Sequence, residues 1–288
     1  MTVGGFTIVR NGIKFDYPFV EAIRSILPLC DEMIVAVGDS DDGTRAAVQA
    51  IGDDKIRVID TVWDDSLRTG GRILAVQTDW ALAQVRADWA FYIQADEVLH
   101  EKYHDRLYST MKARLDDRRV EGLLFDYLHF YGDYDYVGAS LKWYRKEVRV
   151  VRTSAGVVSW KDAQGFRRFD GRRYRKLRVV DSGAEIYHYG WVKPPEIQLR
   201  KAQTFNKYWH DDEWLEKNVP SAFVYDPHIA LNRFSGEHPA VMRPRIENRT
   251  HRFVPERPRL SLKDRVRMEL ERRFGIRPFH YKNYVRIS

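Results

Sequence analysis

Apolar and polar positions along the first 130 residues follow the pattern of a parallel α/β protein. Short runs of β-branched and aromatic residues predict buried strands, and stretches with helical apolar spacing lie between them. The strands are expected at residues 6–10, 33–37, 56–59, 89–93 and 120–130, and the helices at 17–27, 45–51, 69–85 and 100–117. This alternation predicts a parallel sheet covered by helices.

The pattern changes in the second half of the chain. Residues 131–180 are rich in Gly, Tyr, Trp and Arg and predict irregular antiparallel structure added to the sheet. The strands expected here cover residues 141–144, 147–151, 177–180 and 185–191. A helix is expected at 194–209, an extended surface segment at 235–260 and an amphipathic helix at 261–274.

The composition agrees with a soluble α/β protein of one large or two small domains. The chain has 288 residues, of which 44% are hydrophobic and 31% are charged, and its mean hydropathy is −0.52. No apolar run reaches the roughly 20 residues of a membrane-spanning helix, and the N-terminus does not read as a signal peptide. The single cysteine, Cys30, excludes an internal disulfide and indicates a reducing, cytoplasmic compartment.

Positive charge is concentrated at the end of the chain. Residues 241–288 carry 14 Lys or Arg and 5 Asp or Glu, whereas the first 240 residues are slightly acidic. A basic tail indicates an anionic partner, which could be a membrane surface, a nucleic acid or a phosphorylated substrate. Because no nucleic-acid-reading module is present, a nucleic-acid-binding protein is only an alternative hypothesis.

The strand at residues 89–93 is followed directly by polar residues, Gln94-Ala95-Asp96-Glu97. Open α/β sheets bind ligands at the carboxyl ends of their strands, so a carboxylate here is a candidate ligand group. Neighbouring side chains on a strand point to opposite faces. Asp96 and Glu97 can therefore act on the same ligand only if the strand bends there. A plain polar turn is the alternative.

Three stretches in order resemble the family 2 glycosyltransferases, which have the GT-A fold. Residues 21–35 resemble the family's first helix and second strand, residues 40–44 (SDDGT) its S-T-D-G-T loop, and residues 88–97 its W-x-x-x-L-D-A-D-E segment. A weaker likeness, at residues 188–190 (HYG), is to bacterial members that build lipopolysaccharide or related cell-surface glycans. The resemblance covers roughly residues 5–130.

The resemblance implies a mixed, mainly parallel α/β sheet flanked by helices, with antiparallel additions and a C-terminal helical extension. Residues 1–130 would form the nucleotide-sugar-binding half of the domain, residues 131–210 its acceptor-binding half, and residues 211–288 a basic extension. The implied activity is inverting, metal-assisted transfer of a sugar from a nucleotide-diphosphate sugar, most simply a UDP-sugar, to a glycan or lipid-linked acceptor.

By the same resemblance, Asp96 corresponds to the second aspartate of the family's D-x-D motif and would bind Mn²⁺ or Mg²⁺. Hard oxygen ligands suit these ions, which stabilise a departing diphosphate. His188 would add an imidazole ligand, or it is a hydrogen-bonded core histidine. Gln94 replaces the first carboxylate of the motif, which leaves open whether metal is needed and keeps a catalytically weakened sugar-nucleotide-binding protein as an alternative.

The expected nucleotide-sugar-binding set is Arg10, Asp39, Asp42, Arg72, Gln94 and Asp96. Asp39 could substitute for the family's uracil-binding aspartate, or it is an ordinary turn residue. Arg10 and Arg72 border the nucleotide in this fold and could meet phosphate, although Arg72 also reads as surface charge.

An inverting transfer needs a general base for the acceptor hydroxyl. Asp162 is the candidate, with Asp133 and Asp135 as rivals, because no carboxylate aligns with the family's V-H-E segment. The seven basic residues between residues 166 and 178 form a solvated hairpin or a clamp for an anionic acceptor.

The helix at 261–274 has an apolar stripe of Leu262, Val266, Leu270 and Phe274. This stripe predicts packing on the domain or on a second subunit, as in a homodimer. Its basic residues allow a peripheral contact with the inner face of a membrane instead.

Overall fold

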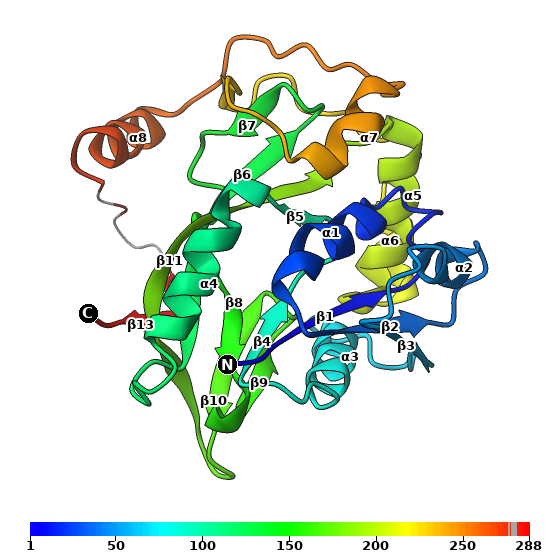
Figure 1. Cartoon of the computed structure of the whole chain (residues 1–288). Coiled ribbons are helices and arrows are strands. Elements are labelled where there is room, and N and C mark those ends of the chain that lie inside the picture. Colours follow the sequence, from blue (N-terminus) through cyan, green and yellow to red (C-terminus); the bar gives the residue numbers. More distant parts are fainter. Residues whose placement is uncertain (276, 278–280) are drawn as a thin grey trace.

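The structure is a computed structural model that describes residues 1–275, 277 and 281–288. Its centre is a twisted sheet with the strand order β3-β2-β1-β4-β8-β6-β11 (Figure 1). These strands are β1 (Val3–Val9), β2 (Glu32–Gly38), β3 (Ile56–Thr61), β4 (Trp89–Tyr92), β6 (Gly122–Tyr131), β8 (Lys146–Arg152) and β11 (Tyr174–Trp191). Strands β1–β4 are parallel, β6 and β11 are parallel to each other, and β8 runs against both of its neighbours.

Helices cover both faces of this sheet. They are α1 (Phe19–Ile26), α2 (Thr44–Gln49), α3 (Arg72–Leu82) and α4 (His104–Ala113). The core that contains α1 and α4 includes Phe91, and the core that contains α3 includes its neighbour Tyr92. Adjacent residues of β4 therefore face opposite layers, as a strand requires. The predicted fold class, a mixed and mainly parallel α/β sheet flanked by helices, is confirmed.

Antiparallel strands are added to the sheet after residue 130, as predicted, and the short strand β5 adds another before it. They are β5 (Glu97–Leu99), β7 (Tyr136–Gly138), β9 (Val157–Trp160), β10 (Gly165–Phe169) and β12 (Leu231–Arg233), with β13 (Tyr284–Arg286) parallel to β11. Two details of the prediction were wrong. Residues 141–144 form a turn rather than a strand. The two pieces expected at 177–180 and 185–191 belong to one strand, β11, whose pairing with β6 is irregular between them.

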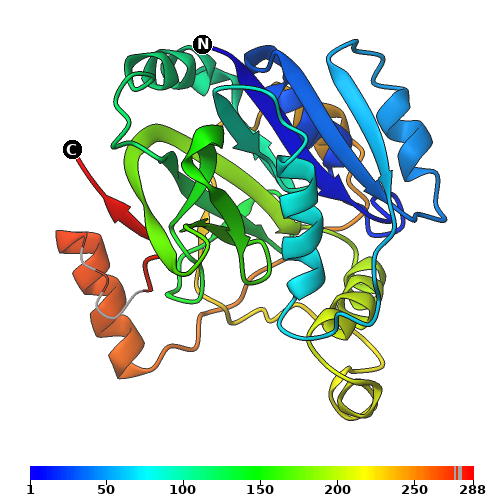
Figure 2. The ribbon, with the colours of Figure 1, turned by 90° about the horizontal axis from the view of Figure 1, so that it is seen from below.

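The tail contains α5 (Pro195–Phe205), α6 (Asp212–Asn218), α7 (Arg243–Glu247) and α8 (Leu262–Phe274). The segment 235–260, expected to be extended, includes α7, which packs near α1 beside the buried Met242. Helix α8 stands out from the body (Figures 1 and 2) and buries none of its residues. The expectation that its apolar stripe packs on the domain is therefore wrong.

Salt bridges rather than apolar contacts attach the α8 region to the body. Arg145 and Arg277 both pair with Glu271 of α8, each at 3.0 Å. No helix in the described part of the chain is long and apolar enough to cross a membrane.

Candidate functional site

A cavity of about 530 Å³ lies at the carboxyl edge of the parallel strands, between the loop after β4, the last residues of β11 and helix α5. Aromatic side chains form much of its wall: Tyr17, Trp63, Trp191, Phe205, Tyr208 and Trp209. Its polar lining includes Arg10, which follows β1, and Asp96, which follows β4. This is the position at which open α/β sheets bind ligands, and the mixture of apolar walls with a few polar groups is typical of a small-molecule site.

Asp96 faces positive charge inside the cavity. The Lys201 ammonium lies 3.3 Å from Asp96 Oδ2 and also donates to the Gly190 carbonyl at 3.3 Å. The ring nitrogen Nε2 of His188 lies 3.7 Å from the same carboxylate oxygen. Burial raises the pKa of Asp96, but attraction to nearby cations, of which Lys201 has the largest effect, outweighs burial and holds this pKa well below its usual range. Asp96 is therefore ionised at neutral pH.

Two lysines flank the ring of Tyr17 beside this carboxylate. The Lys193 and Lys201 ammonium groups lie 4.4 Å and 4.9 Å from the ring centroid. Lys193 is buried and donates to the carbonyl oxygens of Phe15 and Asp16 at 2.8 Å and 3.0 Å. Burial, followed by repulsion from Lys201, lowers the pKa of Lys193 well below its usual value. Lys193 thus anchors the loop after β1 to the end of β11.

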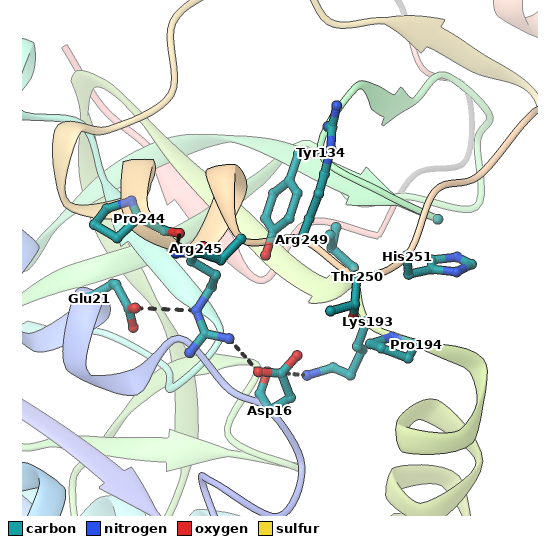
Figure 3. Close-up of a pocket in the computed structure, with 13 residues that line it drawn as sticks. Asp16, Glu21, Tyr134, Lys193, Pro194, Pro244, Arg245, Arg249, Thr250 and His251 are labelled. Carbon is teal, nitrogen blue, oxygen red and sulfur yellow. Dashed lines mark hydrogen bonds and ion pairs between the residues drawn. The ribbon is translucent and has the colours of Figure 1, made fainter.

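A second cavity, of about 460 Å³, lies beside Lys193 (Figure 3). Its Arg245, from α7, bonds to Asp16 and to Glu21 and so joins the tail to the loop after β1 and to α1. Arg249 in the same cavity pairs with Asp135 at 3.1 Å. Because both arginines already have acidic partners, this cavity carries little free positive charge.

Glu97 and Asp96 have separate surroundings. Glu97 is fully buried and forms a two-pronged ion pair with the buried Arg149, at 2.8 Å for each bond. It also accepts hydrogen bonds from the Tyr127 hydroxyl at 2.7 Å and from the backbone amide of Gln94 at 3.1 Å. Glu97 therefore supports the loop that carries Asp96 and does not itself line the cavity.

His188 also contacts a second histidine, His129, through its other ring nitrogen. Its Nδ1 lies 3.2 Å from Nδ1 of His129, whose Nε2 lies 2.8 Å from the carbonyl oxygen of Tyr144. Burial lowers the pKa of His188, and burial followed by repulsion from His188 lowers that of His129. A neutral imidazole beside an ionised carboxylate is a suitable ligand pair for a divalent metal ion.

The donor set fits a metal ion only with additional ligands from outside the protein. Asp96 and His188 would supply two positions, and within the described residues no group of three or more His, Cys, Asp and Glu side chains is placed to hold an ion. Gln94, which replaces a carboxylate, donates through its amide nitrogen to the Ala163 carbonyl at 3.1 Å. Diphosphate oxygens and water would have to complete the coordination of Mn²⁺ or Mg²⁺.

Asp162 lies in the turn between β9 and β10 and lines the cavity. The residues on either side of it, Lys161 and Ala163, have φ angles of 57° and 62° in the left-handed region. Such backbone strain persists only where the surroundings impose it and clusters at functional sites. The rivals Asp133 and Asp135 lie outside the cavity lining. Asp133 is buried, and its carboxylate accepts the amides of Asp135 and Phe253.

The expected nucleotide-sugar-binding residues divide into two groups. Arg10, Gln94 and Asp96 line the cavity, and Asp39 is bonded to Arg10 at 2.9 Å from just outside it. Asp42 stabilises the loop after β2, where its carboxylate accepts the amides of Lys14 and Thr44. Arg72 is exposed at the start of α3 and is not part of the lining.

Sequence reasoning missed one face of α5. Gln198, Lys201, Ala202 and Phe205 line the cavity together, and their spacing is that of a single helical face. The helix itself was predicted, so this spacing was an available signal. Among the described residues, Gln198 Oε1 and Trp63 Nε1 are buried lining atoms without a hydrogen-bond partner. Buried polar groups are normally paired, so these two atoms are available to a polar ligand or to water.

The basic stretch at 166–178 does not reach the cavity. Three of its arginines (Arg168, Arg175 and Arg178) converge on the buried carboxylate of Glu121, just before β6. The geometry favours the solvated hairpin over the acceptor clamp.

No family model and no curated protein matches the chain. Solved structures give partial matches. One is glucosyl-3-phosphoglycerate synthase from Mycobacterium tuberculosis, which was solved with Mn²⁺, UDP and phosphoglyceric acid. It is 22% identical to this chain, and the match covers 44% of this chain and 43% of that chain with a TM-score of 0.31. Mannosyl-3-phosphoglycerate synthase from Rubrobacter xylanophilus is 21% identical, with coverage of 47% and 42% and a TM-score of 0.30.

TarS from S. aureus is 12% identical, with coverage of 71% of this chain and 39% of that chain and a TM-score of 0.38. The match spans less than half the length of each of these three solved chains. The fold class of this protein follows from its own strand order and strand directions. Together, the fold and the cavity define a mixed α/β protein with a candidate ligand site at the carboxyl edge of its parallel strands.

Proposed function

We propose that this protein is a glycosyltransferase that moves a sugar from a nucleoside-diphosphate sugar, most simply a UDP-sugar, to a glycan or lipid-linked acceptor. The observation that carries the proposal is the Asp96 carboxylate in the turn after β4, which faces Lys201 and His188 in a cavity with aromatic walls. Residues 1–130 would bind the donor, residues 131–210 would contribute most of the acceptor side, and residues 211–288 would form the basic extension.

The cations of the cavity suit a diphosphate leaving group. As the bond between the sugar carbon and the phosphate oxygen breaks, negative charge gathers on the diphosphate. Lys201 can donate to those oxygens, and Arg10, held by Asp39 and Asp65 at 2.9 Å and 2.7 Å, lies on the same wall. A divalent metal ion held by Asp96 and His188 would supply Lewis-acid stabilisation of the same charge.

Asp162 is the proposed general base for an inverting transfer. It would accept the proton of the acceptor hydroxyl while that oxygen bonds to the sugar carbon on the face opposite to the diphosphate. Two observations support this role. Asp162 lies in the cavity wall, and the turn around it is strained. Gly71 lies close enough to the Asp162 side chain that a Cβ on it would come within 2.6 Å, so the start of α3 also fixes this turn.

Sugar-nucleotide binding can be tested with a panel of UDP-, GDP-, CMP- and dTDP-sugars, each with and without Mn²⁺, by thermal shift. A ligand that binds only the native protein raises its melting temperature by mass action. We expect one nucleotide class to stabilise the protein and Mn²⁺ to increase the shift. Stabilisation by none of the donors would contradict the proposal.

A second candidate function is sugar-nucleotide binding without turnover. Gln94 in place of a carboxylate and the pairing of Asp96 with Lys201 favour it. A transfer and hydrolysis assay distinguishes the two functions. It uses the donor that the thermal-shift panel identifies. Release of nucleoside diphosphate supports the transferase, and tight binding without release supports the binding protein.

We also propose that α8 contacts an anionic membrane surface, at the cytoplasmic face if the acceptor is lipid-linked. Leu262, Val266 and Phe274 are 79%, 60% and 65% exposed, and Lys263, Arg267 and Arg273 flank this stripe on the helix surface. An apolar stripe bordered by basic residues is the pattern of an interfacial helix. A homodimer through the same stripe is the competing outcome.

A further inference from the structure

The catalytic proposal gives no task to His129, a buried ionisable residue beside the proposed metal ligand His188. His129 of β6 is only 1% exposed and lies directly opposite His188 of β11 in the sheet register. The two ring centroids are 4.9 Å apart. A polar ring at this depth needs partners for both of its nitrogens, and those partners determine where its proton lies.

The hydrogen-bond partners fix the proton positions on both rings. A carbonyl oxygen can only accept, so the short contact from His129 Nε2 to the Tyr144 oxygen, 2.8 Å, requires the hydrogen on Nε2 of His129. In a neutral ring the other nitrogen, Nδ1, is then an acceptor. The hydrogen between the two Nδ1 atoms, which are 3.2 Å apart, must therefore come from His188.

The surroundings of His129 hold it neutral and immobile. Tyr127 and Trp143 stack on its ring, with centroid separations of 5.4 Å and 5.3 Å and interplanar angles of 24° and 26°. Among the described residues no carboxylate bonds to the ring, and its hydrogen-bond partners are the Tyr144 carbonyl and His188. These two packed rings and the hydrogen bonds to both ring nitrogens favour a single orientation of the His129 ring.

We propose that His129 is a positioning residue that keeps His188 in the tautomer with hydrogen on Nδ1, so that the lone pair of His188 Nε2 is directed to the side of Asp96. This inference rests on the proposed function, in which that nitrogen and Asp96 hold a divalent metal ion. The opposite tautomer would place hydrogen on Nε2, facing the Asp96 oxygen 3.7 Å away. A hydrogen bond from His188 Nε2 to Asp96 would occupy this nitrogen and this carboxylate oxygen at once, and neither would then be available to a metal ion.

The tautomers can be read directly by ¹⁵N NMR of the metal-free protein at neutral pH. We expect an unprotonated Nε2 on His188 and an unprotonated Nδ1 on His129, with the signals assigned by their loss in His188→Gln and His129→Gln. A protonated Nε2 on His188 in the wild-type protein would overturn the inference. This measurement needs neither metal nor substrate.

The functional consequence can be measured as Mn²⁺ binding in the presence of UDP, by the EPR signal of free Mn²⁺. Removing a group that orients a metal ligand commonly weakens metal binding by about 10- to 100-fold. We expect that loss in His129→Leu, which removes the acceptor, and substantial recovery in His129→Gln, whose amide can both donate and accept. His228→Gln is the control, because His228 also bonds to a backbone carbonyl, at 3.2 Å, but lies outside the cavity.

The outcomes of these experiments distinguish a failure of this inference from a failure of the proposed function. Full Mn²⁺ affinity in a His129→Leu protein whose thermal unfolding is cooperative would overturn the positioning role. If His129→Leu does not fold, His129→Gln and the wild-type NMR spectrum still decide the tautomer. A wild-type protein that binds no Mn²⁺ with UDP but shows the expected tautomer would refute the metal site and support the structural role of His129.

Discussion

At the scale of residues, the pair Asp96 and Glu97 shows how two adjacent acids acquire different roles. Asp96 faces Lys201 in the cavity, whereas Glu97 is buried against Arg149. Asp96 lies in the turn between β4 and β5, and Glu97 is the first residue of β5, so the change from turn to strand separates the two side chains. The identity of the partners did not follow from the sequence, because Lys201 lies 105 residues and Arg149 lies 52 residues further along the chain.

Asp96→Asn should lower kcat by at least about 100-fold with the donor identified by thermal shift, because removal of this charge weakens both metal binding and the positioning of Lys201. Steady-state kinetics would measure the loss. Asp41→Asn is a matched control, since Asp41 pairs with Lys14 on an exposed loop. Wild-type turnover in Asp96→Asn would refute the assignment of the site.

Asp162→Asn tests the general base. Loss of a base should reduce kcat by about 10²- to 10⁴-fold and leave the KM for the donor nearly unchanged, because the donor is bound elsewhere in the cavity. Asp135→Asn, a change outside the cavity, serves as the comparison, and an equal loss of kcat in both variants would exclude a specific role for Asp162.

At the scale of elements, α5 and α8 show how far helical periodicity can predict the surroundings of a helix. In α5 the face with Gln198, Lys201 and Phe205 turns toward the cavity, and the spacing of these residues could have grouped them on one face. In α8 the apolar stripe was predicted correctly but its environment was not, because the stripe faces solvent. Periodicity shows which residues share a face and does not show what that face meets.

Replacing three residues of the α8 stripe by serine (Leu262→Ser, Val266→Ser and Phe274→Ser) should weaken binding to phosphatidylglycerol vesicles by about 10-fold or more, because apolar area no longer enters the interface. Vesicle co-sedimentation would measure this. Binding of the wild type should also fall at high salt. Val254→Ser alters an equally exposed residue outside α8 and should have no effect. A change of oligomeric state in the triple variant, without vesicle binding by the wild type, would support a homodimer instead.

At the scale of the whole molecule, single acidic residues join distant parts of the chain. Glu121, at the start of β6, bonds to Arg168 of β10 and to Arg175 of β11, and it accepts the backbone amide of Arg178. Burial raises the pKa of Glu121, but these hydrogen bonds outweigh burial and lower the pKa from 4.5 to about 2. The basic hairpin therefore serves the stability of the fold.

The pH dependence of unfolding should reveal this contact. A carboxylate with a lowered folded pKa stabilises the protein above its unfolded pKa, and this stabilisation disappears as the pH falls from 4.5 to about 2. We expect Glu121→Gln to reduce the free energy of unfolding by about 1–3 kcal/mol at pH 7, with little difference left at pH 2. Urea unfolding across this range would measure it, with Asp60→Asn, an exposed partner of Arg45, as the control. A pH-independent difference would contradict this account.

The sequence by itself determined the order of strands and helices in the first 130 residues, the mainly parallel sheet and the place of Asp96 at the end of a strand. These features depend on local periodicity and on the rule that parallel strands gather their carboxyl ends at one edge. Only the tertiary structure decided which groups surround Asp96. Lys201, His188 and the supporting His129 meet it through the pairing of β11 with β6 and the docking of α5. Such contacts depend on strand register and helix orientation over long separations, which no local pattern encodes.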